Sequence, residues 1–361
     1  MTRHPLRRAL VLGPLSLSVA VAMTACGASN ESSGSGGLSG VLNGAGSTAQ
    51  EAAMAAWKAG FQTANSDVTV NYDAVGSGGG RDEFLSGAVN FAGSDAYLSD
   101  DEIAKATTLC GSDPVEIPVY VSPIAVIYNL SGVDALNLSP ATLAQIFAGT
   151  ITTWNDPAIT GENPGASLPD TTITPVHRSD DSGTTENFTD YLSQAAPNDW
   201  SYPAGQTWPL QSGEAGDGTS GVVADVTGGA GTIGYADASQ AADLGQALIQ
   251  VGSAHVGPSA DAASKVLDES QVVTGRPASD IAIKVNRTTT SAEVYPIILI
   301  SYQITCQNQK SQDAADLIKG FESYVVSEEG QNAAASAAGS APLTAALRDK
   351  AQKAIDTITA K

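Results

Sequence analysis

Short apolar segments recur along the chain and predict β-strands. Residues 68–72 alternate apolar and polar side chains, and residues 173–177 form a second short candidate strand. The segment 117–130 is apolar almost throughout, but Pro118 and Pro123 interrupt it. Because proline cannot donate to a strand ladder, we predict either two strand segments here or one connection that crosses the molecule.

Helical periodicity lies between these strands. Residues 50–61 place Met54, Trp57 and Phe61 on one face, and Ser139–Pro140 supplies a cap followed by proline at a first helical position. Strands that alternate with helices favour an α/β fold. Since 361 residues exceed what one ordinary core holds, we expect two lobes.

The first 25 residues predict a bacterial lipoprotein signal peptide. Arg3, Arg7 and Arg8 precede a mostly apolar stretch that ends in Met-Thr-Ala just before Cys26. We expect cleavage before Cys26, lipidation of its thiol, and a Gly/Ser-rich tether over residues 26–40. A plain cleaved signal and an uncleaved N-terminal anchor are the alternatives.

The negative net charge of the chain disfavours two classes of partner. The net charge is −21, and it becomes more negative when the three arginines of the signal are removed. A field of that sign repels nucleic acid and anionic membrane surfaces. An anionic ligand would therefore have to be held by local hydrogen-bond donors.

Two cysteines remain when Cys26 is lipidated. In an oxidising compartment, an even count predicts a disulfide between Cys110 and Cys306, and two separate buried thiols are the alternative. The cysteines and the three histidines are scattered without metal-ligand spacing, so we expect no metal site.

Three Gly/Ser/Thr loops each precede a predicted helix. They are residues 44–48, 76–80 and 180–184, with helices expected at the residues that follow, including 81–88 and 186–192. Free N–H groups at a helix N-terminus favour an anion, and glycine lets the backbone approach it closely. Each loop alone is compatible with an ordinary capped turn, but three together predict a site for a small oxyanion.

Six segments resemble signatures of one known family and occur in that family's order and spacing. They are GAGST (44–48), VNYDAVGSGGG (70–80), FAGSDAYLSD (91–100), IFAGTITTWNDPAI (146–159), RSDDSGTTENF (178–188) and GTIGYAD (231–237). The chain is similar to the phosphate-binding components of bacterial high-affinity phosphate ABC transporters.

The resemblance implies an α/β, type II periplasmic-binding-protein fold of the venus-flytrap kind, with two crossover strands. It places one lobe at residues 41–118 plus 297–361 and the other at 119–296. It also implies a monomeric, non-enzymatic protein without cofactor. We expect such a protein to be anchored by lipid to the outer face of the cell membrane and to deliver phosphate to the permease subunits of an ABC importer.

The resemblance also implies the ligand contacts. They fall on Thr48, Ala49, Ser77, Asp95, Arg178, Ser182, Gly183 and Thr184, with Asp180 bracing Arg178. Taken without the family, Arg178 and Asp180 could form an ordinary surface ion pair, and Asp95 could belong to a turn. The sequence departs from the family pattern at Ala49, at Gly78 where serine is common, and at Asp181 where glycine is frequent.

Two other functions fit parts of the pattern. One is a receptor for another tetrahedral oxyanion, such as sulfate, arsenate or a phosphate ester. The other is an extracellular hydrolase such as a phosphatase, although the sequence has no Gly-x-Ser-x-Gly motif and no histidine beside a recognisable nucleophile.

Overall fold

The structure is a computed structural model that describes residues 37–361. The predicted signal peptide, Cys26 and most of the predicted tether lie outside these residues. No helix within residues 37–361 has both the length and the apolar character needed to cross a bilayer.

Nine strands form one mixed sheet. They are β1 (Ser39–Gly46), β2 (Asp67–Asp73), β3 (Phe91–Ser94), β4 (Pro114–Tyr128), β6 (Thr174–Arg178), β7 (Glu214–Gly216), β8 (Thr232–Asp237), β9 (Gly245–Gln246) and β14 (Ile298–Cys306). Their order is β2-β1-β3-β14-β4-β8-β6-β7, and β9 also pairs with β4.

Seven short strands form three smaller sheets. They are β5 (Asn137–Leu138) with β10 (Leu248–Val251) and β11 (Ala254–Val256), β12 (Gln271–Val272) with β13 (Ile283–Lys284), and β15 (Asn308–Gln309) with β16 (Thr359–Ala360).

Helices lie between most of the strands along the chain and pack against the main sheet. They are α1 (Glu51–Ala64), α2 (Gly76–Leu85), α3 (Asp100–Cys110), α4 (Pro140–Phe147), α5 (Pro157–Glu162), α6 (Gly183–Ala195), α7 (Gly218–Gly228), the 3₁₀ turn η1 (Ala238–Gln240), α8 (Ala260–Asp268), α9 (Gln312–Val326), α10 (Glu328–Ala338) and α11 (Ala345–Asp356).

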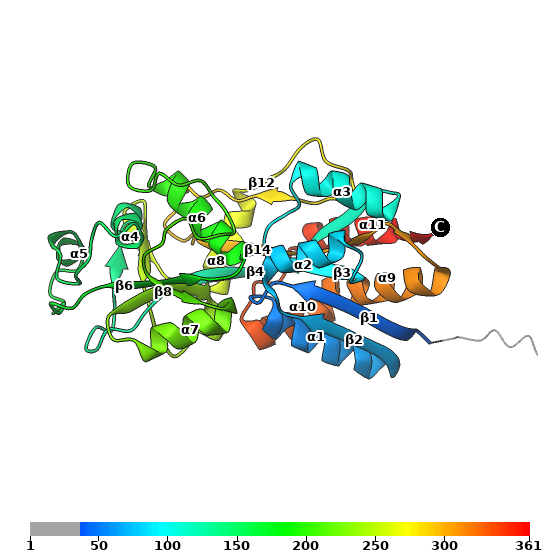
Figure 1. Cartoon of the computed structure of the whole chain (residues 1–361), viewed down its shortest axis with the longest axis horizontal. Coiled ribbons are helices and arrows are strands. Elements are labelled where there is room, and N and C mark those ends of the chain that lie inside the picture. The colour runs from blue at the N-terminus through cyan, green and yellow to red at the C-terminus, as the bar shows by residue number, and fades with distance from the viewer. Residues whose placement is uncertain (1–36) are drawn as a thin grey trace, which may run out of the picture. The chain divides into compact units, whose positions relative to one another are not determined.

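The sheet passes through two lobes (Figure 1). The first lobe holds β1–β3, α1–α3 and α9–α11, and the second holds β5–β8, β10, β11 and α4–α7. Strand β4 belongs to both, because residues 114–123 pair with β14 and residues 124–128 pair with β8. The apolar run at 117–130 therefore forms one crossing strand, and all fifteen residues of β4 are buried.

A bulge accompanies Pro118 on this strand. The register between β4 and β14 shifts between Ser301 and Tyr302, which pair with Tyr120 and Pro118. An extra residue at a bulge tolerates the missing proline N–H and bends the strand.

The predicted lobe boundaries at 118/119 and 296/297 stay a prediction. The return segment from the second lobe makes contacts with the first lobe: Arg276 forms an ion pair with Glu116 and donates to the carbonyl oxygen of Leu98. These contacts place part of the predicted second-lobe range against the first lobe.

Cys110 and Cys306 form a disulfide, as the cysteine count predicts. Their Cα atoms are 5.2 Å apart, and the bond joins the end of α3 to the end of β14. It ties together two parts of the first lobe that are separated in sequence by the whole second lobe.

Candidate functional site

The N-terminus of α1 supplies the first part of the site. Gly44–Gly46, predicted as loop, instead end strand β1, so the connection to α1 is only four residues long. The Ser47 hydroxyl accepts from the N–H groups of Ala49 and Gln50 at 3.1 and 3.2 Å. Thr48 and Ala49, two predicted ligand residues, are buried beside it.

Helix α2 begins earlier than the sequence predicts. Gly76–Gly80 form its first turns instead of a loop, and this glycine-rich turn packs against the end of β1, where a side chain would not fit. A Cβ on Gly80 would lie 2.3 Å from the Cα of Gly46 at the end of β1. Ser77 is buried in this turn, and its hydroxyl accepts from the N–H of Asp95 at 3.0 Å.

Asp95 follows β3 and is held by two serine hydroxyls. Ser47 donates to Oδ2 at 2.7 Å and Ser301, on the crossover strand β14, donates to Oδ1 at 2.6 Å. Ser47 already accepts two N–H groups and Ser301 accepts from Gln50 Nε2, so both hydroxyl hydrogens point to the carboxylate. Asp95 is therefore an acceptor on both oxygens.

The pKa of Asp95 reflects opposing effects. Burial raises this pKa above its ordinary value, and the hydroxyls of Ser301 and Ser47 and the charge of Arg178 lower it in part. The carboxyl group thus carries a cost of ionisation that its hydrogen-bond donors offset only in part.

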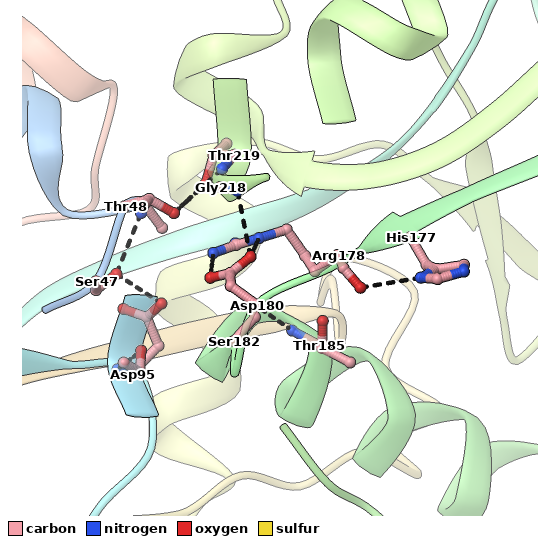
Figure 2. A network of polar contacts seen from close by, with 12 residues as sticks. Ser47, Thr48, Asp95, His177, Arg178, Asp180, Ser182, Thr185, Gly218 and Thr219 are labelled. Atoms are coloured by element: carbon pink, nitrogen blue, oxygen red, sulfur yellow. Dashed lines mark hydrogen bonds and ion pairs between the residues drawn. The ribbon is translucent and has the colours of Figure 1, made fainter. Parts of the chain in front are cut away.

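Arg178 and Asp180 form the predicted brace. Nε of Arg178 donates to Oδ1 of Asp180 at 2.6 Å, and Nη2 pairs with Oδ2. Both residues lie near Ser47, Thr48 and Asp95 (Figure 2). Arg178 is buried and the Asp180 side chain is 15% exposed, so the pair is largely shielded from solvent and is not the ordinary surface ion pair of the alternative. The other edge of the guanidinium remains for a ligand.

Helix α6 supplies the third N-terminus. Ser182 is its cap and accepts from the N–H of Thr185 at 3.1 Å, so the helix begins at Gly183, three residues before the predicted start. A Cβ on Gly183 would lie 2.5 Å from Ser77 Oγ and 2.7 Å from Asp95 Cβ. Glycine is required here because the first lobe approaches this helix end closely.

Thr184 has an orphaned hydroxyl. The residue is 1% exposed, and its Oγ1 has no hydrogen-bond partner among residues 37–361. A buried hydroxyl without a partner costs about 1–3 kcal/mol. This observation fits a site in which a ligand accepts from Thr184.

A fourth helix N-terminus, that of α7, contacts the site and is not among the three predicted from the sequence. The hydroxyls of Thr48 and Thr219 are 2.9 Å apart, and the Thr219 N–H donates to Thr48 Oγ1 at 3.1 Å. The N–H of Gly218 donates to Asp180 Oδ1 at 3.2 Å (Figure 2). The residues Asp-Gly-Thr-Ser-Gly at 217–221 carry the same loop signal as the other three and could have been found by it.

Other residues near the site have packing roles. Tyr235 is hydrogen-bonded to the Thr185 hydroxyl at 2.7 Å, and burial raises its pKa to about 12. His177 stacks on Trp208 and donates from Nδ1 to the carbonyl oxygen of Arg178 at 2.9 Å. Within residues 37–361 His177 makes no hydrogen bond to Ser182, whose hydroxyl caps α6.

Two cavities adjoin this cluster. One of about 400 Å³ is lined by Thr48, Asp180 and Gly218, and one of about 260 Å³ is lined by Asp95 and Asn187. Within residues 37–361, no group of three or more histidine, cysteine, aspartate or glutamate side chains is placed to hold a metal ion.

The cluster combines many donors with two carboxylates, of which Asp180 is engaged by Arg178 and the Gly218 N–H. N–H groups and hydroxyls at four helix ends, together with the Arg178 guanidinium, favour a small oxyanion. Asp95 is the carboxylate among them that faces both lobes, since its side chain contacts Ser47 and its backbone contacts α6.

The chain is similar to proteins of one superfamily over most of its length. Residues 30–329 match the PBP superfamily domain. The phosphate-binding protein PstS 3 of Mycobacterium tuberculosis is 37% identical over 84% of this chain and 86% of its own. The phosphate-binding protein PstS2 of Mycobacterium bovis is 33% identical over 93% of this chain and 95% of its own.

A solved structure shares the fold. The high-affinity periplasmic phosphate-binding protein PfluDING, determined with bound phosphate, superposes with a TM-score of 0.72 at 24% identity. The match covers 87% of this chain and 93% of that one.

Proposed function

The chain belongs to the phosphate-binding PstS proteins of the PBP superfamily, and we propose that it captures inorganic phosphate outside the cytoplasm for an ABC importer. It acts as a substrate-binding protein and not as an enzyme. The observation that carries the proposal is the orphaned Thr184 hydroxyl, which is buried in the first turn of α6, next in sequence to Ser182 and Gly183.

We assign the ligand contacts to the cluster described above. Donors from the first lobe are Thr48, the Ala49 N–H and Ser77, and donors from the second lobe are Arg178, Ser182, Gly183 and Thr184. Asp95 accepts from the protonated oxygen of phosphate. Because donors come from both lobes, phosphate would favour the arrangement in which the lobes meet.

Short contacts in a buried site can hold an anion against the negative net charge of the protein. The net charge of −21 repels phosphate at long range, so affinity must come from short, directional contacts in a buried place. Buried donors act in a lower effective dielectric, where each contact to an anion is stronger than it is in water.

The location and partners follow from the N-terminal sequence. We propose that lipid on Cys26 and the tether at 26–40 hold a monomeric protein at the outer face of the cell membrane, near the permease that receives phosphate. Mass spectrometry of the native N-terminus should find acyl chains on Cys26, and Cys26→Ala should release the protein; a secreted wild-type chain with an unmodified N-terminus would contradict the anchor.

Calorimetric titration of the protein without its lipid tests the binding function. We expect tight phosphate binding, competition by arsenate, and negligible heat with sulfate. A phosphatase assay with added divalent metal tests the hydrolase alternative. Comparable sulfate binding, or turnover of phosphate esters, would overturn the proposal.

Two threonines on α6 provide a matched pair of variants. Thr184→Val removes the orphaned hydroxyl and should weaken phosphate binding by about tenfold while leaving the unfolding midpoint unchanged or higher. Thr189→Val removes a buried hydroxyl that donates to the Thr185 carbonyl oxygen at 2.9 Å, so it should lower stability and leave the affinity unchanged. The opposite pattern would show that the Thr184 hydroxyl does not bind phosphate.

A further inference from the structure

A buried arginine outside the ligand cluster joins the site helix to the crossover. Arg287 is 3% exposed and lies between β13 and β14. Its guanidinium donates to Asp190 Oδ2 (2.9 Å), Asn187 Oδ1, and the carbonyl oxygens of Pro296 (3.0 Å) and Ile298 (2.8 Å). Two of these acceptors are on α6, and two are on the chain that enters β14.

Asn187 carries this contact across to the first lobe. Its Nδ2 donates to the carbonyl oxygen of Gly183 at 2.9 Å, on its own helix, and to that of Asp95 at 2.7 Å, on the opposite lobe. Since arginine has only donors, Arg287 fixes the amide with Oδ1 toward the guanidinium and both N–H groups toward the carbonyl oxygens.

The Asp95 backbone is therefore held on both sides. Its N–H donates to Ser77 within the first lobe, and its carbonyl oxygen accepts from Asn187 in the second. The Ser77 contact lies within one lobe, whereas the Asn187 contact joins α6 of the second lobe to the residue that follows β3 in the first. The Asn187 amide thus holds the backbone of Asp95, whose carboxylate is the proposed acceptor of the site.

We propose that Arg287 and Asn187 form an interlobe latch that slows phosphate release, an inference that rests on the proposed phosphate-binding function. Arg287 is a positioning residue that acts through Asn187, and Asn187 stabilises the closed lobes by holding the Asp95 backbone. A contact made only in the closed state affects how fast the lobes separate more than how fast ligand first binds.

Dissociation kinetics test the latch. Protein loaded with radiolabelled phosphate is chased with excess unlabelled phosphate, and retained label is followed by filter binding. Asn187→Ala should release phosphate about tenfold faster, because one net hydrogen bond of the closed state is lost. The association rate should stay within about twofold of wild type.

Asn163 provides the matched control. It is also a buried amide with three hydrogen bonds, from Asn137 N–H and to the carbonyl oxygens of Asn137 and Ile159, but all of them lie within the second lobe. Asn163→Ala should lower the urea midpoint and leave the release rate unchanged. Faster release from this variant as well would mean that general loosening, and not the latch, sets the rate.

Two further variants keep the test decisive. Asn187→Asp retains an acceptor for Arg287 but turns an oxygen toward the Asp95 carbonyl, so release should again accelerate. Arg287→Lys should accelerate release in the wild-type background and have little further effect beside Asn187→Ala, because it acts through the amide. Wild-type release rates in both Asn187 variants would overturn the latch, whereas failure of the wild-type protein to bind phosphate would overturn the proposed function instead.

Discussion

Gly78 and Asp181 occupy adjoining space on opposite lobes. The Gly78 N–H donates to the Asp181 carbonyl oxygen at 3.0 Å, and a Cβ added to Gly78 would lie 2.6 Å from the Cβ of Asp181. These are two of the positions at which the sequence departs from the family pattern. The departures are coupled in part, since the Asp181 side chain crowds a Cβ at position 78 together with Gln206 Oε1 at 2.7 Å and the Asp181 carbonyl oxygen at 3.2 Å.

Gly78→Ser should therefore weaken phosphate binding by about tenfold, because the added Cβ overpacks the contact between the lobes. Asp181→Gly in the same chain should restore part of the affinity, because it relieves the contact with the Asp181 side chain and leaves those with Gln206 Oε1 and the residue 181 carbonyl oxygen. Calorimetry over the double-mutant cycle measures the coupling. Gly161→Ser is the control, since a Cβ there meets nothing within 4 Å. Additive effects of the two substitutions would contradict the coupling.

Asp95 should act as the selectivity filter. Phosphate near neutral pH keeps a proton that a carboxylate can accept, whereas sulfate offers only acceptors, and a buried carboxylate repels it. Wild-type protein should exclude sulfate, and Asp95→Asn should keep much of the phosphate affinity while the gap to sulfate narrows. Arsenate should compete in both proteins. A variant that excludes sulfate as firmly as wild type would show that the filter lies elsewhere.

The disulfide should stabilise the protein by constraining the unfolded chain. Cys110 and Cys306 are 196 residues apart, so reduction should lower the free energy of unfolding by roughly 3–5 kcal/mol. Urea unfolding with and without reductant measures this difference, and a Cys110→Ala/Cys306→Ala double variant should be insensitive to reductant. An unchanged midpoint on reduction of the wild type would contradict the expectation.

Asp237 should make stability depend on pH. Burial raises its pKa to about 6, although it accepts from Tyr120 at 3.0 Å and from the Ser239 hydroxyl at 2.6 Å. In the unfolded chain an aspartate titrates near pH ~3.9, so the native state holds the extra proton between about pH 4 and pH 6. Stability from this group is fully present below that window and is lost as pH rises through it, by about 3 kcal/mol.

Asp237→Asn removes this titration. The difference in the free energy of unfolding between wild type and variant, measured by urea unfolding from pH 4 to pH 8, should change across the window and level off above pH 6. A difference that stays constant with pH would assign the proton to another group.

The parts of the site that were predictable lie close together in sequence or carry a local signal. Arg178 and Asp180 are two residues apart, and Ser182 precedes an evident helix. Residues 76–80 are helical although they were predicted to form a loop. The prediction failed because glycine normally disfavours a helix, and the sequence does not show that β1 approaches this turn too closely for side chains.

The remaining contacts depend on tertiary structure. Ser301 is 206 residues from Asp95 and sits in an apolar strand, and Asn187 looks like any polar residue of a helix. No local pattern marks either residue, because its role arises from where the crossover strand and the opposite lobe place its partner. The fold class follows from the alternation of strands and helices, whereas these contacts arise only when folding brings distant segments of the chain together.

The position of β14 has a consequence for how the chain is made. This strand lies between β3 and β4, yet it leaves the ribosome after the entire second lobe. Until residues 298–306 emerge, β3 and β4 each present an open edge, and the thiol of Cys110 has no partner. The first lobe therefore completes its fold only after the C-terminal part of the chain has been made, and until then its open strand edges are available for non-native pairing.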